Sequence, residues 1–104
     1  MIVSTLEYVP GRNISEHLGV VQGSTVRAKH IGRDIAASLK NIVGGELKGY
    51  SELLMDAREE AYQRMLAQAE AKGANAVLCV RFTTSSVTQG ASEILAYGSA
   101  VVVD

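Results

Sequence analysis

The sequence has a single cysteine and a single proline, and it lacks long runs of like charge or of apolar residues. Because Cys79 has no second cysteine to pair with, an intrachain disulfide is excluded, which suits a reducing compartment. Ten basic residues are interspersed with eleven acidic ones, which argues against a nucleic-acid-binding arm and an anionic-membrane anchor. The longest strongly apolar stretch, residues 94–103, is far shorter than the ~20 residues that cross a bilayer. Since the amino end also lacks the basic segment of a signal peptide, we expect a cytoplasmic protein.

Catalytic and nucleotide-binding motifs are missing as well. The sequence has no nucleophile elbow, no catalytic-triad spacing and no dinucleotide fingerprint. Residues 44–50 (GGELKGY) are rich in glycine, but they lack the Gly-Lys-Ser/Thr that a phosphate-binding loop needs after a strand. The acidic residues of 52–60 recur at helical spacing, which is typical of a solvated helix face. These absences favour a binding or scaffold protein over an enzyme.

The length and composition predict one domain, residues 1–104. A chain of this size buries roughly two thirds of its unfolded surface, which is enough for one core without a metal or a disulfide. Residues 1–6 and 14–23 are rich in β-formers and predict two strands, joined by the Pro-Gly turn of residues 8–13.

Two helices are expected in the middle of the chain. In residues 30–43 the apolar residues recur at intervals of four, four and three, and Gly44-Gly45 follows as a stop. A longer helix is predicted from about Ser51, as its N-cap, to Lys72, with Gly73 as its stop signal; Tyr50 could instead lie inside this helix. The apolar stripe of the longer helix is formed by Leu54, Ala57, Ala61, Met65 and Ala69, and Leu53, Tyr62 and Leu66 widen it.

The carboxyl-terminal part predicts a β-hairpin, with strands over 75–88 and 93–103 and a loop at 89–92. Strict alternation places Leu78, Val80 and Phe82 on one face of the first strand and Val77, Cys79, Arg81 and Thr83 on the other. The fold class is therefore α+β: a two-layer α/β domain in which an antiparallel or mixed sheet is covered on one face by a short and a long helix.

The last strand predicts self-association, because both of its faces are apolar and one helical layer covers a single face of a sheet. The uncovered face would expose Leu95, Tyr97, Val101 and Val103, with Val77 and Cys79 beside them. Contiguous patches of this kind usually mark an interface, so we expect a second copy to cover it. The alternative is that the amino-terminal strands of the same chain fold over this face.

Few residues are candidates for binding chemistry. His17, His30 and Cys79 are the only histidine and cysteine ligands for a metal, but they form no close-spaced pair, and a structural zinc site normally needs four. They could still converge within one chain or around a symmetry axis; otherwise they are surface histidines and a buried small thiol. Arg33-Asp34, near the start of the first helix, are either part of a solvated helix face or an arginine that binds an anion or carboxylate.

Several short sequence pieces together resemble the YbjQ family, small bacterial and archaeal proteins of unknown function, over residues 3–103. These pieces are Gly19-Val20-Val21-x-Gly23, Arg33-Asp34, Ile42-Val43-Gly44-Gly45, Tyr50, Ala57-Arg58, Ala61, Gly73-Ala74-Asn75-Ala76-Val77 and Gly98-Ser99-Ala100-Val101. The resemblance implies a subunit similar to that of dodecin, associated as a pentamer, and a family sometimes labelled as heavy-metal-binding. The matching pieces contain no cysteine or histidine.

The resemblance makes its polar pieces the candidate ligand site: Arg33, Asp34, Gly44, Gly45, Tyr50 and Arg58. The same residues could instead lock the helices together or pair across subunits. The first functional hypothesis is a pentameric binding or scaffold protein that uses neither nucleic acid nor membrane as a partner. The alternatives are a heavy-metal-binding protein, with the metal as its only suggested cofactor, and a carrier or enzyme for a small anion with sites between subunits.

Overall fold

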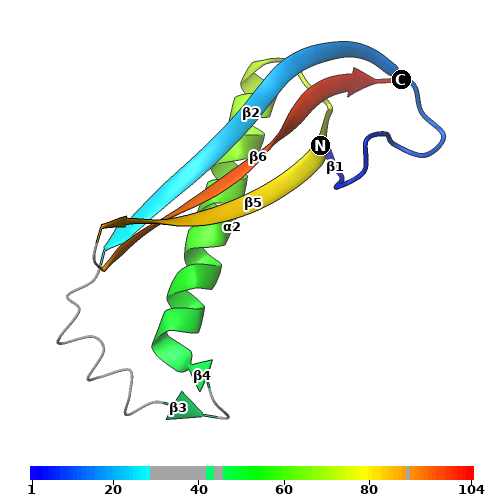
Figure 1. Cartoon of the computed structure of the whole chain (residues 1–104). Helices are drawn as coiled ribbons and strands as arrows, with labels where there is room; N and C mark the ends of the chain where they lie inside the picture. The colour runs from blue at the N-terminus through cyan, green and yellow to red at the C-terminus, as the bar shows by residue number, and fades with distance from the viewer. Residues whose placement is uncertain (29–41, 44–45, 89) are drawn as a thin grey trace.

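A computed structural model describes residues 1–28, 42–43, 46–88 and 90–104 of the chain. Its main sheet has the strand order β1-β5-β6-β2, formed by β1 (Ile2–Val3), β5 (Ala76–Thr88), β6 (Ala91–Val103) and β2 (Ile14–Ala28). β1 pairs with β5 in parallel and the other pairs are antiparallel, so the sheet is mixed. The helix α2 (Lys48–Ala71) crosses one face of this sheet, and the two layers confirm the predicted α+β class (Figure 1).

The long helix begins and ends close to the predicted positions. It starts at Lys48, so Tyr50 lies inside it and Ser51 is not the N-cap. Its carboxyl end has the two hydrogen bonds of a Schellman motif, from Gly73 N to Glu70 O and from Ala74 N to Ala69 O, and Gly73 takes the positive φ of 85° that this motif requires. No helix among the described residues combines the length and apolar character needed to cross a membrane.

The shorter predicted helix, residues 30–43, falls mostly outside the described residues. At its end, Ile42–Val43 forms the strand β3, which pairs with β4 (Glu46–Leu47), so the expected helix does not include these two residues. The predicted strand over 14–23 is longer than expected and continues to Ala28, since Gly23 lies within it.

The core between α2 and the sheet is built largely from small side chains. Ala57, Ala61, Met65 and Ala69 of the predicted stripe are all fully buried. They pack against the sheet residues Val21, Val77, Val80, Ile94, Ala96 and Ala100. Alanine on the helix allows a close approach to the sheet, and Met65 is the large side chain that α2 buries over Ser51–Ala71, where its side chains are described.

The expected alternation of β5 is wrong because the strand contains a bulge. Cys79 adopts a φ of 55°, and the pairing of β5 with β6 shifts between Leu78 and Arg81. As a result Val77 and Val80 both face α2, whereas Leu78 and Cys79 lie in a second apolar cluster on the opposite face. One extra residue in a strand reverses the facing of every residue before it relative to those after it.

The amino-terminal segment covers part of the face that we expected a second copy to shelter. Val101 and Val103 are buried there together with Ala76 and Leu78, and Ile2 and Val9 pack against them. For these valines the stated alternative, cover by the same chain, is correct. Leu95 is half-buried and Tyr97 is 38% exposed, so the cover does not extend along the whole strand.

Because of the bulge, glycine is expected to be more stabilising than alanine at position 79, which is the reverse of their order in an ordinary strand. In an ordinary strand glycine is less stable than alanine by roughly 0.5–1 kcal/mol, but at a left-handed φ the β-carbon costs about 1–2 kcal/mol. We therefore expect Cys79→Gly to be more stable than Cys79→Ala by about 1 kcal/mol in urea unfolding. Both variants lose the Cys79 thiol, so their difference isolates the backbone. Ser99 of β6 is the control, where alanine should be the more stable; the same order at both positions would contradict the bulge.

Candidate functional site

The sheet and the helix diverge towards the end at which β5 turns into β6, here called the distal end (Figure 1). The described residues extend over 52 × 27 × 16 Å with a radius of gyration of 17.1 Å, whereas a compact chain of this length has about 13 Å. Large apolar side chains that are 37–62% exposed accompany this elongation on α2, β2 and β5. They are Val26, Leu54, Met55, Phe82 and Val87.

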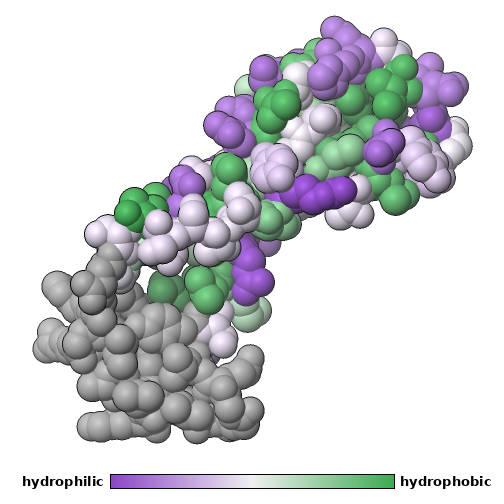
Figure 2. Space-filling view, in the orientation of Figure 1, coloured by the Kyte–Doolittle hydropathy of each residue, from purple (hydrophilic) through white to green (hydrophobic). Residues whose placement is uncertain are grey.

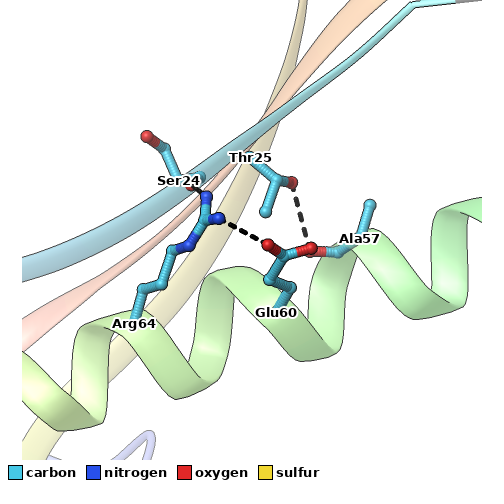
Figure 3. Close-up of polar contacts among 5 residues, drawn as sticks. All are labelled: Ser24, Thr25, Ala57, Glu60 and Arg64. Atoms are coloured by element: carbon cyan, nitrogen blue, oxygen red, sulfur yellow. Dashed lines mark hydrogen bonds and ion pairs between the residues drawn. The ribbon is translucent and has the colours of Figure 1, made fainter.

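α2 is fixed to the edge strand β2 rather than to the centre of the sheet. Thr25 Oγ1 donates a hydrogen bond to Ala57 O at 3.1 Å, and Arg64 Nη1 donates to Ser24 O at 2.6 Å (Figure 3). Glu60 forms an ion pair with Arg64 one helical turn away and holds the guanidinium beside the strand. Because the helix is held over β2 and β6, it covers little of β5.

A hollow of about 420 Å³ lies between α2 and the poorly covered β5. It is lined by Met55, Arg58, Glu59, Tyr62 and Phe82, and we call it the α2–β5 hollow. The four helix residues share one side because they recur at intervals of three and four. Phe82 points to the same side because it lies two residues after Val80, which faces α2.

Two of the side chains that line this hollow are aromatic rings in contact with each other. Tyr62 and Phe82 are stacked, with ring centroids 6.4 Å apart and planes inclined at 21°. Phe82 is nevertheless 48% exposed, and Met55 beside it is 62% exposed. A stacked pair of this geometry presents apolar area that would be stabilised by contact with a further apolar group.

Arg58 is the predicted ligand-site residue that the structure places in this hollow. Its Nε donates to Leu54 O at 3.2 Å, which directs the side chain back along its own helix. The side chain is exposed, and its terminal nitrogens are available to an anion or to a partner's carboxylate. Tyr50 lies in α2 eight residues before Arg58, about 12 Å along the axis. Arg33, Asp34, Gly44 and Gly45 lie outside the described residues.

The metal candidates do not come together among the described residues. His17 is exposed on β2 opposite Val101, and half-buried Cys79 is on β5, so β6 lies between them. The Cys79 thiol contacts Leu6 O at 3.7 Å. No group of three His, Cys, Asp or Glu side chains suited to a metal ion occurs in the described part of the chain; His30 lies outside it. The described donors therefore do not fit a heavy-metal centre.

The sequence interpretation missed most of the hollow. It assigned Tyr62 to the apolar stripe and Glu59 to a solvated face, and it gave Met55 and Phe82 no role. The spacing of Met55, Arg58 and Tyr62 along one side of the helix was a usable signal. Strict alternation already placed Phe82 with Val80 on the covered face of β5, but the stacking of Phe82 on Tyr62 is a tertiary contact that no spacing in the sequence shows.

Comparison with known proteins gives a consistent family assignment. A family described as "Putative heavy-metal-binding" matches residues 1–104. A UPF0145 protein of Hahella chejuensis is 64% identical over the full length of both chains, and one of Clostridioides difficile is 59% identical over all of this chain and 93% of that protein. A crystal structure of a DUF74-family protein of unknown function from Pediococcus pentosaceus shares the fold, with a TM-score of 0.69 at 14% identity, covering 100% of this chain and 98% of that one.

Proposed function

Because the chain belongs to the YbjQ family, a group of UPF0145 proteins, we propose that it is a homo-oligomeric binding or scaffold protein in which a second copy covers the α2–β5 hollow. The resemblance described above implies five copies. The observation that carries the proposal is the exposure of Met55 and Phe82 beside the stacked Tyr62. Apolar side chains of this size contribute about 1.5–3 kcal/mol each when they become fully buried.

The surface of the molecule also supports a contact with a second copy at the distal end. The narrower part of the described surface carries apolar side chains between polar ones (Figure 2). The described residues are more extended than a compact domain of similar length, and neighbouring copies would complete their packing. The bound copy would also place Arg58 at an interface, which is where the anion-carrier hypothesis locates its site.

The proposal predicts the mass of the protein in solution and how one substitution changes it. Light scattering after size exclusion should give a multiple of 11.0 kDa for the wild type, with five copies giving five times 11.0 kDa, about 55 kDa. Met55→Glu would bury a carboxylate in the contact, so we expect association to weaken at least tenfold, equivalent to about 1.4 kcal/mol. Met55 is largely exposed in the single chain, so the variant should keep its fold by circular dichroism.

Tyr8→Glu is the matched control for this experiment. Tyr8 is 56% exposed in the amino-terminal turn, and this turn lies at the other end of the sheet from the β5–β6 turn (Figure 1). This variant should assemble as the wild type does. A wild-type mass of 11.0 kDa at about 100 μM protein would overturn the proposal, since interfaces with micromolar constants are assembled at that concentration. Equal masses for Met55→Glu and the wild type would show that the contact lies elsewhere.

A further inference from the structure

The two long edges of the main sheet differ in how their main-chain groups are used. On the β2 edge, Gln68 Oε1 accepts a hydrogen bond from Gln22 N at 2.7 Å, and Arg64 Nη1 donates to Ser24 O at 2.6 Å. Side chains of α2 thus occupy the middle of this edge, as Figure 3 shows for Arg64. Covering an edge in this way prevents it from pairing with another strand.

The opposite edge, formed by β5, is covered over its first part alone. β1 pairs with Ala76 and Val77, and the amino-terminal segment continues the cover, with bonds from Cys79 N to Leu6 O and from Val80 N to Ser4 O. The Arg81 guanidinium then donates to Thr5 O at 3.1 Å. Beyond Arg81, no described segment pairs with the outer side of β5.

The register shows which residues of this uncovered stretch point their main-chain groups outward. The outward bonds of Gln22 and Ser24 mean that Gly23 and Thr25 bond inward, to Ala96 and Ile94 of β6. Ala96 and Ile94 therefore direct their main-chain groups to β2 and not to their β5 partners, Phe82 and Thr84. The main-chain groups of Phe82 and Thr84 thus point away from the sheet, as that of Val80 does.

The residues of this edge include neither of the side-chain features, proline and charge, that natural edges use against pairing, and the register with β6 stays regular from Arg81 to Ser86, where it shifts before Thr88. Phe82–Thr88 includes no proline and no charged side chain, and it consists of an aromatic residue, a valine and five small hydroxyl residues. Seven residues of strand span about 23 Å. Because the stretch is neutral, a like copy meets no charge repulsion along it.

We propose that the outer edge of β5 over Phe82–Thr88 pairs with a strand of a second copy of this chain and extends the sheet across the subunit boundary. The inference rests on the proposed self-association and specifies how it is made. Phe82 belongs both to this edge and to the α2–β5 hollow, so one neighbouring copy can satisfy the main-chain groups and cover the apolar side chains together. The small hydroxyl side chains offer no pockets to select a particular foreign peptide, which favours a second copy as the occupant.

A proline at position 84 tests the pairing. The Thr84 N–H points outward, so Thr84→Pro removes a donor from the free edge and leaves the bonds between β5 and β6 in place. We expect Thr84→Pro to lower the mass seen by light scattering towards 11.0 kDa. Thr84→Ala, which keeps the N–H, should assemble as the wild type does. Assembly of Thr84→Pro with wild-type mass and affinity would overturn the pairing.

Hydrogen exchange provides a second measurement that does not depend on the proline variant folding. In the assembled wild type, the Phe82 and Thr84 amides should exchange at least 100-fold more slowly than in Met55→Glu dissociated to the monomer. A second stretch that gains protection would identify the pairing strand. An assembled wild type in which these two amides exchange at the monomer rate would overturn the pairing but leave self-association standing, whereas a monomeric wild type would overturn both.

Discussion

Replacing Gly23 by alanine is expected to destabilise the fold by about 3 kcal/mol or more, in urea unfolding at one protein concentration. A β-carbon at this position would lie 2.3 Å from Ala61 O and 2.4 Å from Met65 N. Both atoms belong to the backbone of α2, so a side-chain rotation cannot relieve the overlap. The helix would have to move away from β2 and would lose contacts along its buried alanine stripe.

The neighbouring Gln22 is the matched control for this prediction. Its side chain is exposed, and its hydrogen bond to Gln68 is made by the main chain, so Gln22→Ala should change the free energy of unfolding by less than about 0.5 kcal/mol. Ala61→Gly should not rescue Gly23→Ala, because the overlap involves the Ala61 carbonyl oxygen. A cost below about 1 kcal/mol for Gly23→Ala would mean that the helix does not cross the strand at this point.

The helix could be predicted from the sequence because its determinants are local. The spacing of Ala57, Ala61 and Met65 fixes the buried side, and Gly73 supplies the conformation that ends the helix. Its first turn was less certain, since Ser51 is a good N-cap in isolation. The helix nevertheless begins at Lys48, directly after β4.

The side of the sheet on which Val77 and Leu78 lie could not be predicted, because nothing in the sequence marks Cys79 as the bulged residue. Bulges with a left-handed residue usually place glycine there, and this chain has Cys79 in a run of β-formers. A strict alternation was the only reasonable expectation, and it assigned Val77 to the wrong face. The predicted interface was wrong at this position for the same reason, because Val77 was counted among the residues that a second copy would cover.

The cover over Val101 and Val103 depends on contacts between the two ends of the chain. Ile2 and Val9 reach these residues across nearly the whole sequence, and no periodicity relates them. The same applies to the hollow: Arg58 came from the family resemblance, whereas its neighbour Phe82 is brought there by tertiary packing. The self-association inferred from the apolar last strand remains a prediction. The exposed surface that supports it lies on α2 and β5 and not on the last strand.

Replacing Gly98 by alanine is the second substitution expected to have a large effect, about 2–3 kcal/mol. A β-carbon there would lie 2.8 Å from Val77 Cγ1, 2.9 Å from Leu78 O and 3.2 Å from Val80 Cγ2. The crowding follows from the Cys79 bulge, which turns both valines to the helix face above Gly98. Ser99→Ala, at the adjacent half-buried position, should cost less than about 1 kcal/mol.

A double-mutant cycle connects this crowding to the bulge. Val77→Ala alone removes buried methyl groups and should be destabilising. It also removes the Cγ1 atom nearest to the added β-carbon, so Gly98→Ala should cost about 1 kcal/mol less in the Val77→Ala background than in the wild type. The Leu78 carbonyl oxygen remains in place, so the relief should be incomplete. Strict additivity of the two substitutions would mean that Val77 does not lie over Gly98, and would contradict the bulged register of β5.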